Sequence, residues 1–337
     1  MRRVRSGGVW VPAADQRIRY VGSWGAYDVA ARATVNSGSR VVFGFTGRTL
    51  TGRFDVSTIS HPGQIWISVD GARPTMRTVN ADRIRLAPRR LHDGPHTVEI
   101  TVKDVDIDGR RWKTPLHSGI IVTGFELDRG ARIVDGPPAS DVRMLFLGDS
   151  ITQGSRALNL ARGPHGADGR MSFAALTARA FGADADQIGF GGQGVLRPVA
   201  PGGVPPADET FGWNFHGSPA ERDPHVIVVN QGTNDSAFPA EAFRTAYSAY
   251  LGQIRAAHPN AWIFAMRPFG GYHATEVEAI VKALNDAKTT YVDTTDWLEP
   301  TDFEDGVHPL VVGHLRAARR LTEIIASTTG LAATRVR

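Results

Sequence analysis

The chain changes its secondary-structure pattern near residues 135–140, and this change limits the possible folds more than any other feature. The segment Asp135-Gly136-Pro137-Pro138-Ala139-Ser140 is rich in turn-forming residues. Before it, short runs of β-branched and aromatic residues are divided by Gly, Pro and Asp, as is typical of strands. After it, apolar runs alternate with amphipathic helical segments. We therefore expect a β domain over residues 1–136 and an α/β domain over residues 141–337.

The first part contains several strand-like segments of similar length. In one of them, Ile65, Ile67 and Val69 alternate with Trp66 and Ser68, as expected when one face of a sheet is buried. The predicted strands cover residues 40–45, 50–56, 64–69, 96–102 and 119–127. This pattern predicts an all-β sandwich or jelly roll.

The second part alternates strands with helices. Strands are predicted at residues 144–147, 183–188, 226–230, 262–266 and 290–293, and helices at residues 172–181, 240–257, 276–285 and 310–327. Such alternation predicts a parallel sheet with helices on both faces. Ligands of these sheets bind at the carboxyl ends of the strands, so residues that follow the strands are the first candidates for a site.

Gly148-Asp149-Ser150 follows the first of these strands. A serine at this point is either a nucleophile or part of a helix N-cap, whose side chains accept from free backbone N–H groups. Nucleophilic catalysis requires a base, an orienting acid and oxyanion donors from elsewhere in the chain.

Candidates for these partners follow Ser150 in the sequence. Asp305 precedes His308 by three residues, which allows the carboxylate to accept from one ring nitrogen while the other faces a nucleophile. Asn234 lies in a glycine-led turn after the strand at 226–230, where its amide can serve as an oxyanion donor. The glycine-rich turn 189–194 can direct a backbone N–H into a pocket.

In type and order these blocks resemble those of the SGNH (GDSL) hydrolase superfamily. The resemblance implies a three-layer, flavodoxin-like α/β fold, with Ser150 as nucleophile and Asp305 and His308 completing the triad. The Gly-x-Ser-x-Gly elbow of the usual α/β-hydrolases is absent from the sequence.

The same resemblance implies an oxyanion hole made by the Ser150 N–H, the Gly192 N–H and the Asn234 side chain. Because the glycines are crowded, Gly191 or Gly194 could supply the N–H in place of Gly192.

The β part resembles carbohydrate esterase family two, which joins a small jelly roll to an SGNH domain. The resemblance rests on the turn segments 68–71, 91–99 and 124–128 followed by the Ser150 block, and it spans nearly the whole chain. It implies a carbohydrate O-deacetylase that removes small acyl groups, acetyl above all. Residues 104–109 depart from the pattern of that family and leave the sugar open.

Two other functions are compatible with the sequence: an SGNH lipase or thioesterase acting on lipid or acyl-CoA esters, and a non-catalytic carbohydrate-binding protein. Trp213 is a candidate for stacking on a sugar ring, or else a packed lid residue. Arg267 is a candidate for binding substrate, or else part of a surface ion pair.

Five further residues have structural interpretations beside functional ones. Trp24 and Trp66 are either a carbohydrate platform or core residues. We expect His314 to be structural, and Asp149 and Asp235 to cap helices and brace loops.

Composition argues against several kinds of partner. The net charge is +4, but arginines are scattered among acids in groups no denser than pairs such as Arg110-Arg111, which indicates a solvated surface rather than a nucleic-acid site. The 11 histidines show no metal-ligand spacing, so we expect neither a metal nor another cofactor. With no cysteine, disulfides and thiol nucleophiles are excluded.

Targeting signals are also weak. No apolar run approaches the roughly 20 residues of a membrane helix, so no membrane association is predicted. The basic start Met1–Gly8 lacks the apolar segment of a signal peptide. We therefore expect a cytoplasmic protein, unless a leader has been trimmed from the sequence. The sequence does not predict the oligomeric state.

Overall fold

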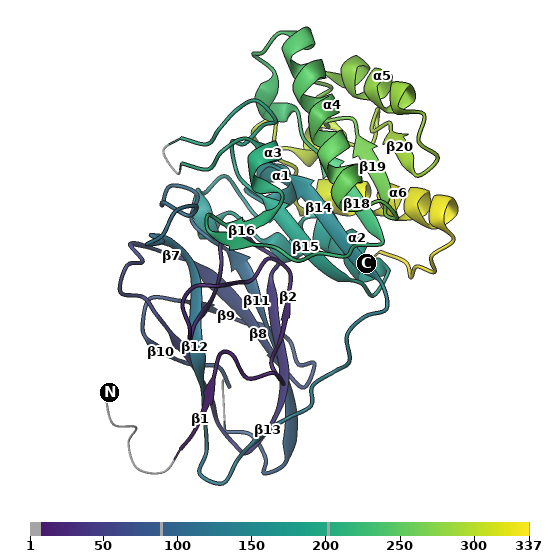
Figure 1. Ribbon diagram of the computed structural model, residues 1–337. Helices are drawn as coiled ribbons and strands as arrows, with labels where there is room; N and C mark the ends of the chain where they lie inside the picture. The colour runs from purple at the N-terminus through teal and green to yellow at the C-terminus, as the bar shows by residue number, and fades with distance from the viewer. Residues whose placement is uncertain (1–7, 88–89, 201–202, 337) are drawn as a thin grey trace.

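The computed structural model describes residues 8–87, 90–200 and 203–336. A β sandwich formed by the first part of the chain lies below an α/β part formed by the rest (Figure 1). The predicted fold class is therefore confirmed. The basic N-terminal segment, on which the expected location depends, lies almost wholly outside the described residues.

The sandwich consists of two mainly antiparallel sheets. One has the order β10-β6-β12-β4-β3, with β1 and β7 also paired to β12, and the other has the order β13-β5-β11-β8-β9, with β2 paired to β5. The strands of the first sheet are β1 (Val9–Pro12), β3 (Gly25–Ala26), β4 (Arg32–Thr34), β6 (Leu50–Phe54), β7 (His61–Pro62), β10 (Arg83–Arg85) and β12 (Ser118–Leu127). Those of the second are β2 (Arg19–Val21), β5 (Arg40–Thr46), β8 (Gln64–Val69), β9 (Thr75–Thr78), β11 (Pro95–Asp104) and β13 (Ile133–Val134).

The five strands predicted in this part are β5, β6, β8, β11 and β12. The strands that sequence patterns missed have four residues or fewer, too short to show a period of two. Arg83–Arg85 illustrates the difficulty, since only Ile84 is buried and its two neighbours are exposed arginines.

The α/β part is built on one parallel sheet with the strand order β15-β14-β18-β19-β20, which is the flavodoxin-like order. Its strands are β14 (Arg143–Gly148), β15 (Asp184–Gly189), β18 (Val226–Asn230), β19 (Trp262–Met266) and β20 (Thr289–Val292). Its main helices are α2 (Phe173–Ala180), α4 (Ala240–Ala257), α5 (Ala274–Leu284) and α6 (Val311–Thr329). Shorter elements are α1 (Ser150–Gln153), α3 (Ala207–Thr210), and the hairpin strands β16 (Trp213–Phe215) and β17 (Ser218–Pro219).

Alternate residues of each strand point to opposite layers of helices. Met144 and Phe146 pack in one cluster with α2 and α6, whereas Leu145 and Leu147 pack in another with α4 and α5. Both faces of β14 are therefore buried, which explains why its sequence is a continuous apolar run. Three layers result, as the sequence predicted.

The strand ends that carry the predicted site lie in register. Gly148 pairs with Gly189 on one side and with Asn230 on the other. Because the three strands are parallel, the segments that follow these residues leave the sheet at the same edge. The fold itself thus brings together the Ser150, Gly191 and Asn234 segments.

The two parts share a hydrophobic cluster. Ala33, Trp112 and Ile121 of the sandwich pack in the same cluster as Phe190 and the α4 layer. An ion pair between Arg19 and Asp184 also crosses the junction, with 2.7 Å between the charged atoms. The sandwich is therefore packed onto the α/β part rather than tethered to it.

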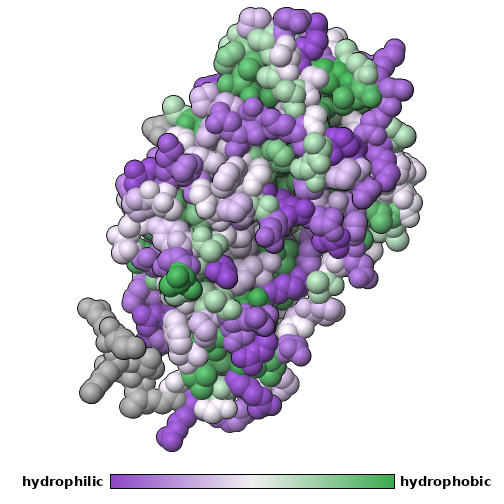
Figure 2. Space-filling view, in the orientation of Figure 1, coloured by the Kyte–Doolittle hydropathy of each residue, from purple (hydrophilic) through white to green (hydrophobic). Residues whose placement is uncertain are grey.

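Hydrophilic and hydrophobic side chains are interspersed over both parts on the face that Figure 2 shows. Among the described residues, no helix is long and apolar enough to cross a bilayer. One expectation about the surface was wrong: Arg111, placed with its neighbour on the solvated surface, has no exposed area.

Candidate active site

Ser150 is held at the end of β14 by a sharp turn. Gly148 is needed there because a Cβ atom would lie 2.0 Å from Thr152 Oγ1. The Asp149 carboxylate caps the first turn of α1 by accepting from the Ile151 N–H at 2.9 Å. Asp149, and not Ser150, is thus the N-cap, and the serine hydroxyl is left for another partner. The Ser150 residue is 8% exposed.

That partner is His308. Its Nε2 lies 2.9 Å from Ser150 Oγ, and its Nδ1 lies 2.7 Å from Asp305 Oδ2. The three residues predicted for the triad therefore form a continuous chain of hydrogen bonds, although Ser150 and His308 are 158 residues apart. This is the geometry that a serine nucleophile, its base and an orienting acid require.

Asp305 is further fixed by its surroundings. Burial by itself would raise its pKa, but hydrogen bonds from the His308 N–H and ring and the Val307 N–H, together with the Arg156 guanidinium, outweigh it and hold the pKa well below the usual range. Arg156 also forms a short ion pair with this carboxylate. Asp305 is therefore ionised over the whole pH range in which an imidazole acts as a base.

Of the three candidate glycines in the turn after β15, two have N–H groups that donate to other protein groups. The Gly191 N–H donates to Gln153 Oε1 at 3.1 Å, and the Gly194 N–H donates to the Arg197 carbonyl at 2.9 Å. The Gly192 N–H has no acceptor among the described protein groups, and Gly192 lines the cavity beside Ser150. Its φ of +83° favours glycine. Of the three glycines left open by the sequence, Gly192 has the geometry of an oxyanion donor.

Asn234 follows β18, which pairs with β14 on the side opposite to β15. Its Nδ2 donates to the Gln193 carbonyl at 2.8 Å and approaches Asp149 Oδ2 at 3.3 Å. Burial, followed by the nearby Asp235 charge, raises the pKa of Asp149 to about 7 against the effect of its hydrogen bonds. The amide is thus anchored with its nitrogen toward the serine turn, and Asn234 lines the cavity.

Asp235 braces the glycine turn from behind. Its carboxylate accepts from the backbone N–H groups of Val195, Leu196 and Arg197 at 2.8–3.2 Å. Gly194 has room for no side chain, because a Cβ atom would lie 2.2 Å from Asp235 Oδ1. Asp149 and Asp235 therefore cap and brace, as the sequence analysis predicted.

The cavity in front of Ser150 has a volume of about 370 Å³. One wall comes from the loop between β11 and β12, which contributes Ile107 and Asp108. The cavity is lined by Ile107, Asp108, Ser150, Ser155, Arg156, Ala161, Arg162, Gly163, Gly191, Gly192, Arg197, Pro198, Val199, Ala200, Asn234, Val307 and His308. Both parts of the chain thus build the site.

The two predicted substrate-binding residues lie outside this cavity. Trp213 is 39% exposed in the hairpin strand β16. Arg267 follows β19, and its Nη1 donates to the Pro268 carbonyl of the same loop at 3.5 Å and to Thr294 Oγ1, after β20, at 3.4 Å. Since neither lines the space around Ser150, the structure does not support a contact of these residues with the reacting group.

The remaining sequence candidates have structural surroundings. Trp66 donates from Nε1 to Asp168 at 2.9 Å and is covered by the Arg170 guanidinium, so its indole ring already has partners at the junction of the two parts. Trp24 packs edge-on against Tyr20 beside the sandwich core.

His314 is fully buried and accepts from the Phe173 N–H through Nδ1 at 3.1 Å. Burial, followed by the nearby His308, lowers its pKa to about 3, so this ring is neutral at ordinary pH. His314 is a structural residue, as predicted.

No group of three or more His, Asp or Glu side chains able to hold a metal ion occurs in residues 8–87, 90–200 and 203–336. The candidate site consists of the serine, imidazole, carboxylate and amide groups already described.

Sequence reasoning missed two polar residues beside the triad. Arg156 contacts Asp305, and Gln153 contacts the glycine turn. Gln153 lies directly after Ser150-Ile151-Thr152, and this closeness to the predicted nucleophile is the one sequence signal that could have marked it. Nothing in the local sequence links Arg156 to a carboxylate 149 residues away.

Residues 146–316 match the model of the GDSL-like Lipase/Acylhydrolase family. The match covers just over half of the 337 residues and includes Ser150, Asn234, Asp305 and His308. The chain belongs to this family. Membership in the GDSL-like family agrees with the parallel sheet and with the position of Ser150 at the end of β14.

Relatives of this GDSL-like chain include proteins named as carbohydrate esterases. It is 26% identical to cellulase/esterase CelE of Acetivibrio thermocellus over 87% of its own length, but spans only 37% of that protein. It is 24% identical to an acetylxylan esterase/glucomannan deacetylase of Cellvibrio japonicus, covering 93% of this chain and 89% of the relative.

A solved structure of similar architecture extends the match to the sandwich. It is a family two carbohydrate esterase from Clostridium thermocellum in complex with cellohexaose, with a TM-score of 0.77 and 25% identity over 93% of this chain and 99% of the other. The combination of a β sandwich with a GDSL-like part is therefore shared along nearly the whole length.

Proposed function

We propose that this protein is a serine esterase that removes small acyl groups, acetyl in particular, from carbohydrates. The observation that carries the proposal is the chain of hydrogen bonds from Ser150 through His308 to Asp305 at the wall of a cavity. Gly192 and Asn234 line the same cavity as the serine, where they can serve as oxyanion donors.

In the first half of the reaction, His308 Nε2 accepts the proton of Ser150 as Oγ attacks the ester carbonyl carbon. Asp305 accepts from Nδ1, which fixes the tautomer and stabilises the imidazolium. The carbonyl oxygen becomes an oxyanion that accepts from the N–H groups of Ser150 and Gly192 and from Asn234. When the tetrahedral intermediate collapses, His308 gives its proton to the departing sugar hydroxyl.

In the second half, water replaces the sugar. His308 removes a proton from the water as it attacks the acyl-enzyme carbonyl, and the same donors hold the second oxyanion. Collapse breaks the bond to Oγ, which takes the proton back from His308 and leaves free acetate.

The choice of a carbohydrate substrate is supported by the relatives. One is named as an acetylxylan esterase/glucomannan deacetylase, and another similar structure holds cellohexaose. The cavity of about 370 Å³ is at the small end of the range for ligand pockets, which suits a short acyl group.

Acyl-chain preference separates this proposal from the lipase or thioesterase alternative. We expect p-nitrophenyl acetate to be hydrolysed with a higher kcat/KM than p-nitrophenyl decanoate. Faster turnover of the decanoate would favour the alternative.

Covalent labelling tests whether the protein is an enzyme or a non-catalytic carbohydrate-binding protein. A fluorophosphonate should label Ser150, and the Ser150→Ala variant should remain unlabelled. Absence of labelling in the wild-type protein would contradict the esterase proposal. If labelling occurs, acetate release from a panel of acetylated mono- and oligosaccharides identifies the sugar.

A further inference from the structure

Two charged side chains, Asp104 at the end of β11 and Arg111 in the loop between β11 and β12, are buried beside the glycine turn. Asp104 and Arg111 have no exposed area. Gln153 lies between them: its Nε2 donates to Asp104 Oδ1 at 2.7 Å, and its Oε1 accepts from Arg111 Nη1 and Nη2 at 3.2 and 3.3 Å. We refer to Asp104, Gln153 and Arg111 as the Gln153 clamp.

The clamp extends to the turn that carries the proposed oxyanion donor. Gln153 Oε1 also accepts from the Gly191 N–H at 3.1 Å. The Arg111 guanidinium lies 4.9 Å from the centroid of the Phe190 ring, and Trp112 meets the same ring edge-on. Arg111 and Trp112 thus hold Phe190, and Gln153 holds Gly191. These are the two residues that directly precede Gly192 in the chain.

A second loop of the sandwich holds the backbone at the same place. Ser37 Oγ donates to the Gln153 carbonyl at 2.7 Å, and Asn36 Oδ1 accepts from the Gly189 N–H at 3.3 Å. The end of β15 and the end of α1 are therefore both tied to the sandwich.

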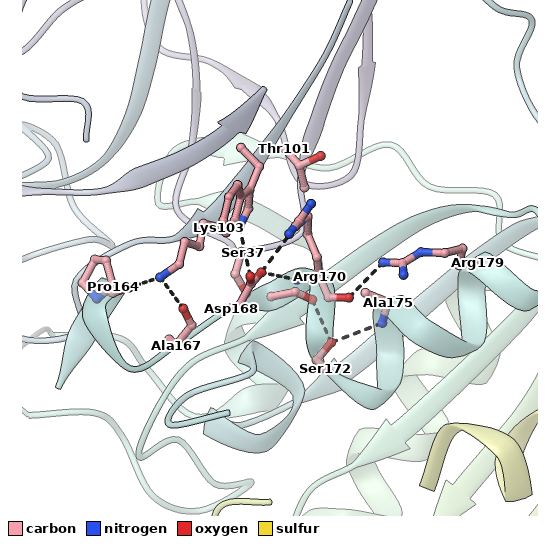
Figure 3. A network of polar contacts seen from close by, with 12 residues as sticks. Ser37, Thr101, Lys103, Pro164, Ala167, Asp168, Arg170, Ser172, Ala175 and Arg179 are labelled. Atoms are coloured by element: carbon pink, nitrogen blue, oxygen red, sulfur yellow. Dashed lines mark hydrogen bonds and ion pairs between the residues drawn. The ribbon is translucent and has the colours of Figure 1, made fainter. Parts of the chain in front are cut away.

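The position of Asp104 depends on an irregularity in β11. The pairing of β11 with β8 shifts its register between Val102 and Asp104. A bulge of this kind re-aims side chains. As a result, the neighbours Lys103 and Asp104 both face the α/β part, where Lys103 donates to the Pro164 and Ala167 carbonyls (Figure 3) and Asp104 reaches Gln153.

Removing the charges of Asp104 and Arg111 from water costs free energy, and a need for good packing does not explain why charged residues stand there. Burial raises the pKa of Asp104 to about 7 and lowers the pKa of Arg111 to about 10. Apolar residues of similar size in place of a buried charged network often stabilise a protein. Neither side chain lines the cavity, so neither contacts the reacting ester.

We propose that Asp104 and Arg111 are positioning residues, which act through Gln153 to hold the Gly192 N–H toward the reacting carbonyl. This inference rests on the proposed esterase function. The sandwich is then part of the catalytic apparatus, because its buried charges orient a donor that belongs to the α/β part. A polar clamp suits this task, since hydrogen bonds fix direction in a way that apolar contacts do not.

The test removes the acceptor at Asp104 and then restores it. Asp104→Ala takes away the acceptor for Gln153 Nε2, whereas Asp104→Asn keeps an oxygen in its place and removes only the charge. We expect kcat for p-nitrophenyl acetate to fall about 10- to 100-fold in Asp104→Ala, because a misplaced donor costs rate but not substrate affinity. KM should change less than about 3-fold, and Asp104→Asn should recover most of the lost kcat.

A boronic acid inhibitor reports on the oxyanion hole directly, because its tetrahedral adduct with Ser150 places an oxygen among the oxyanion donors. We expect inhibition by phenylboronic acid to weaken in Asp104→Ala by about the same factor as kcat/KM falls. If Asp104 served only stability, Asp104→Ala would lower the melting temperature but leave both kcat/KM and the inhibition constant of phenylboronic acid unchanged.

Trp66→Phe provides a matched control at the same junction. It removes the hydrogen bond from Nε1 to Asp168, keeps an aromatic ring beneath Arg170, and changes no residue of the Gln153 clamp. We expect a lower melting temperature and the wild-type kcat.

Each outcome decides between explanations. Wild-type kcat and boronate affinity in folded Asp104→Ala would overturn the inference, and so would an equal loss of kcat in Trp66→Phe. If Asp104→Ala does not fold, Arg111→Lys takes its place, since it keeps the cation but loses the two-nitrogen contact with Gln153 Oε1; an unchanged kcat there would also overturn the inference. Failure of the proposed function is distinct, because the wild-type protein would then be inactive and unlabelled by fluorophosphonate.

Discussion

The two walls of the cavity use charged groups in opposite ways. On the wall formed by the loop before α6, the side chains of Asp305 and His308 are 16% and 17% exposed and lie next to Ser150. At the loop between β11 and β12, which forms another wall, Asp104 at the end of β11 and Arg111 within the loop are completely buried and do not line the cavity. Groups that exchange protons with a substrate need access to it, whereas groups that fix a direction work best where water is excluded. A charged residue near an active site therefore need not take part in the reaction.

The largest expected effect lies on the reactive wall. Ser150→Ala should lower kcat for acetyl esters by about 10⁶-fold, the scale seen when a triad nucleophile is removed, while the melting temperature stays close to wild type. Ser327→Ala is the matched control, because that exposed hydroxyl bonds only to the carbonyl of Ile324 on its own helix. Appreciable turnover by Ser150→Ala would mean that the reactive wall has been misidentified.

The next effect concerns Asn234, the proposed side-chain donor of the oxyanion hole. Asn234→Ala should lower kcat about 10²- to 10³-fold, because one oxyanion donor is lost. Asn234→Asp keeps the size but replaces the donor with an acceptor, so it should be no better. Steady-state kinetics with p-nitrophenyl acetate measures both, and a kcat within 3-fold of wild type in either variant would exclude Asn234 from the oxyanion hole.

Comparing Gly192→Ala with Gly217→Ala separates the effect of backbone strain on stability from an effect on catalysis. Gly192 and Gly217 have φ angles of +83° and +85°, and a Cβ atom meets open space at both positions, apart from one contact of 4.0 Å at Gly192. Alanine at either position should therefore reduce the free energy of unfolding similarly, by about 1–2 kcal/mol.

Only the Gly192 substitution should also affect the reaction. We expect kcat to fall about 10-fold as the turn shifts in Gly192→Ala, while Gly217→Ala keeps the wild-type value. Urea unfolding and ester hydrolysis on the two variants test this, and equal kcat values would remove the Gly192 N–H from the mechanism.

The smallest effect on activity is expected at His314, which lies on α6 but is buried. Burial lowers the pKa of His314 to about 3 in the folded protein, from an ordinary value of 6.5. The unfolded chain therefore binds a proton that the folded protein does not, and the stability that neutral His314 contributes is lost as the pH falls from about 6.5 to about 3, by at most about 1.4 kcal/mol per pH unit.

His314→Gln should keep an acceptor for the Phe173 N–H and remove this pH dependence. At pH 7 its kcat should equal that of the wild type, because His314 does not line the cavity. Urea unfolding between pH 4 and 7 measures the slope, and identical slopes for the two proteins would contradict the buried, neutral state.

Much of the fold was predictable because both parts have strong local patterns. The apolar run of β14 and the amphipathic α4 appear in the sequence almost at their observed bounds. Short strands such as β10 were missed, since three residues with one buried side chain carry no usable period. Trp213 and Arg267 were proposed as substrate contacts from residue type and strand position alone, and they lie outside the cavity.

By itself, the sequence determined the order of the blocks that carry Ser150, Gly192, Asn234 and the Asp305-His308 pair, because strand ends and short motifs are local features. Only the tertiary structure decided that Gly192 has the free N–H, and that Arg156 pairs with Asp305. Only the tertiary structure also decided that Arg111, one of an ordinary-looking pair of arginines, is buried against Gln153. These contacts join segments far apart in the chain, and their energies depend on exclusion of water, which no local pattern of residues records.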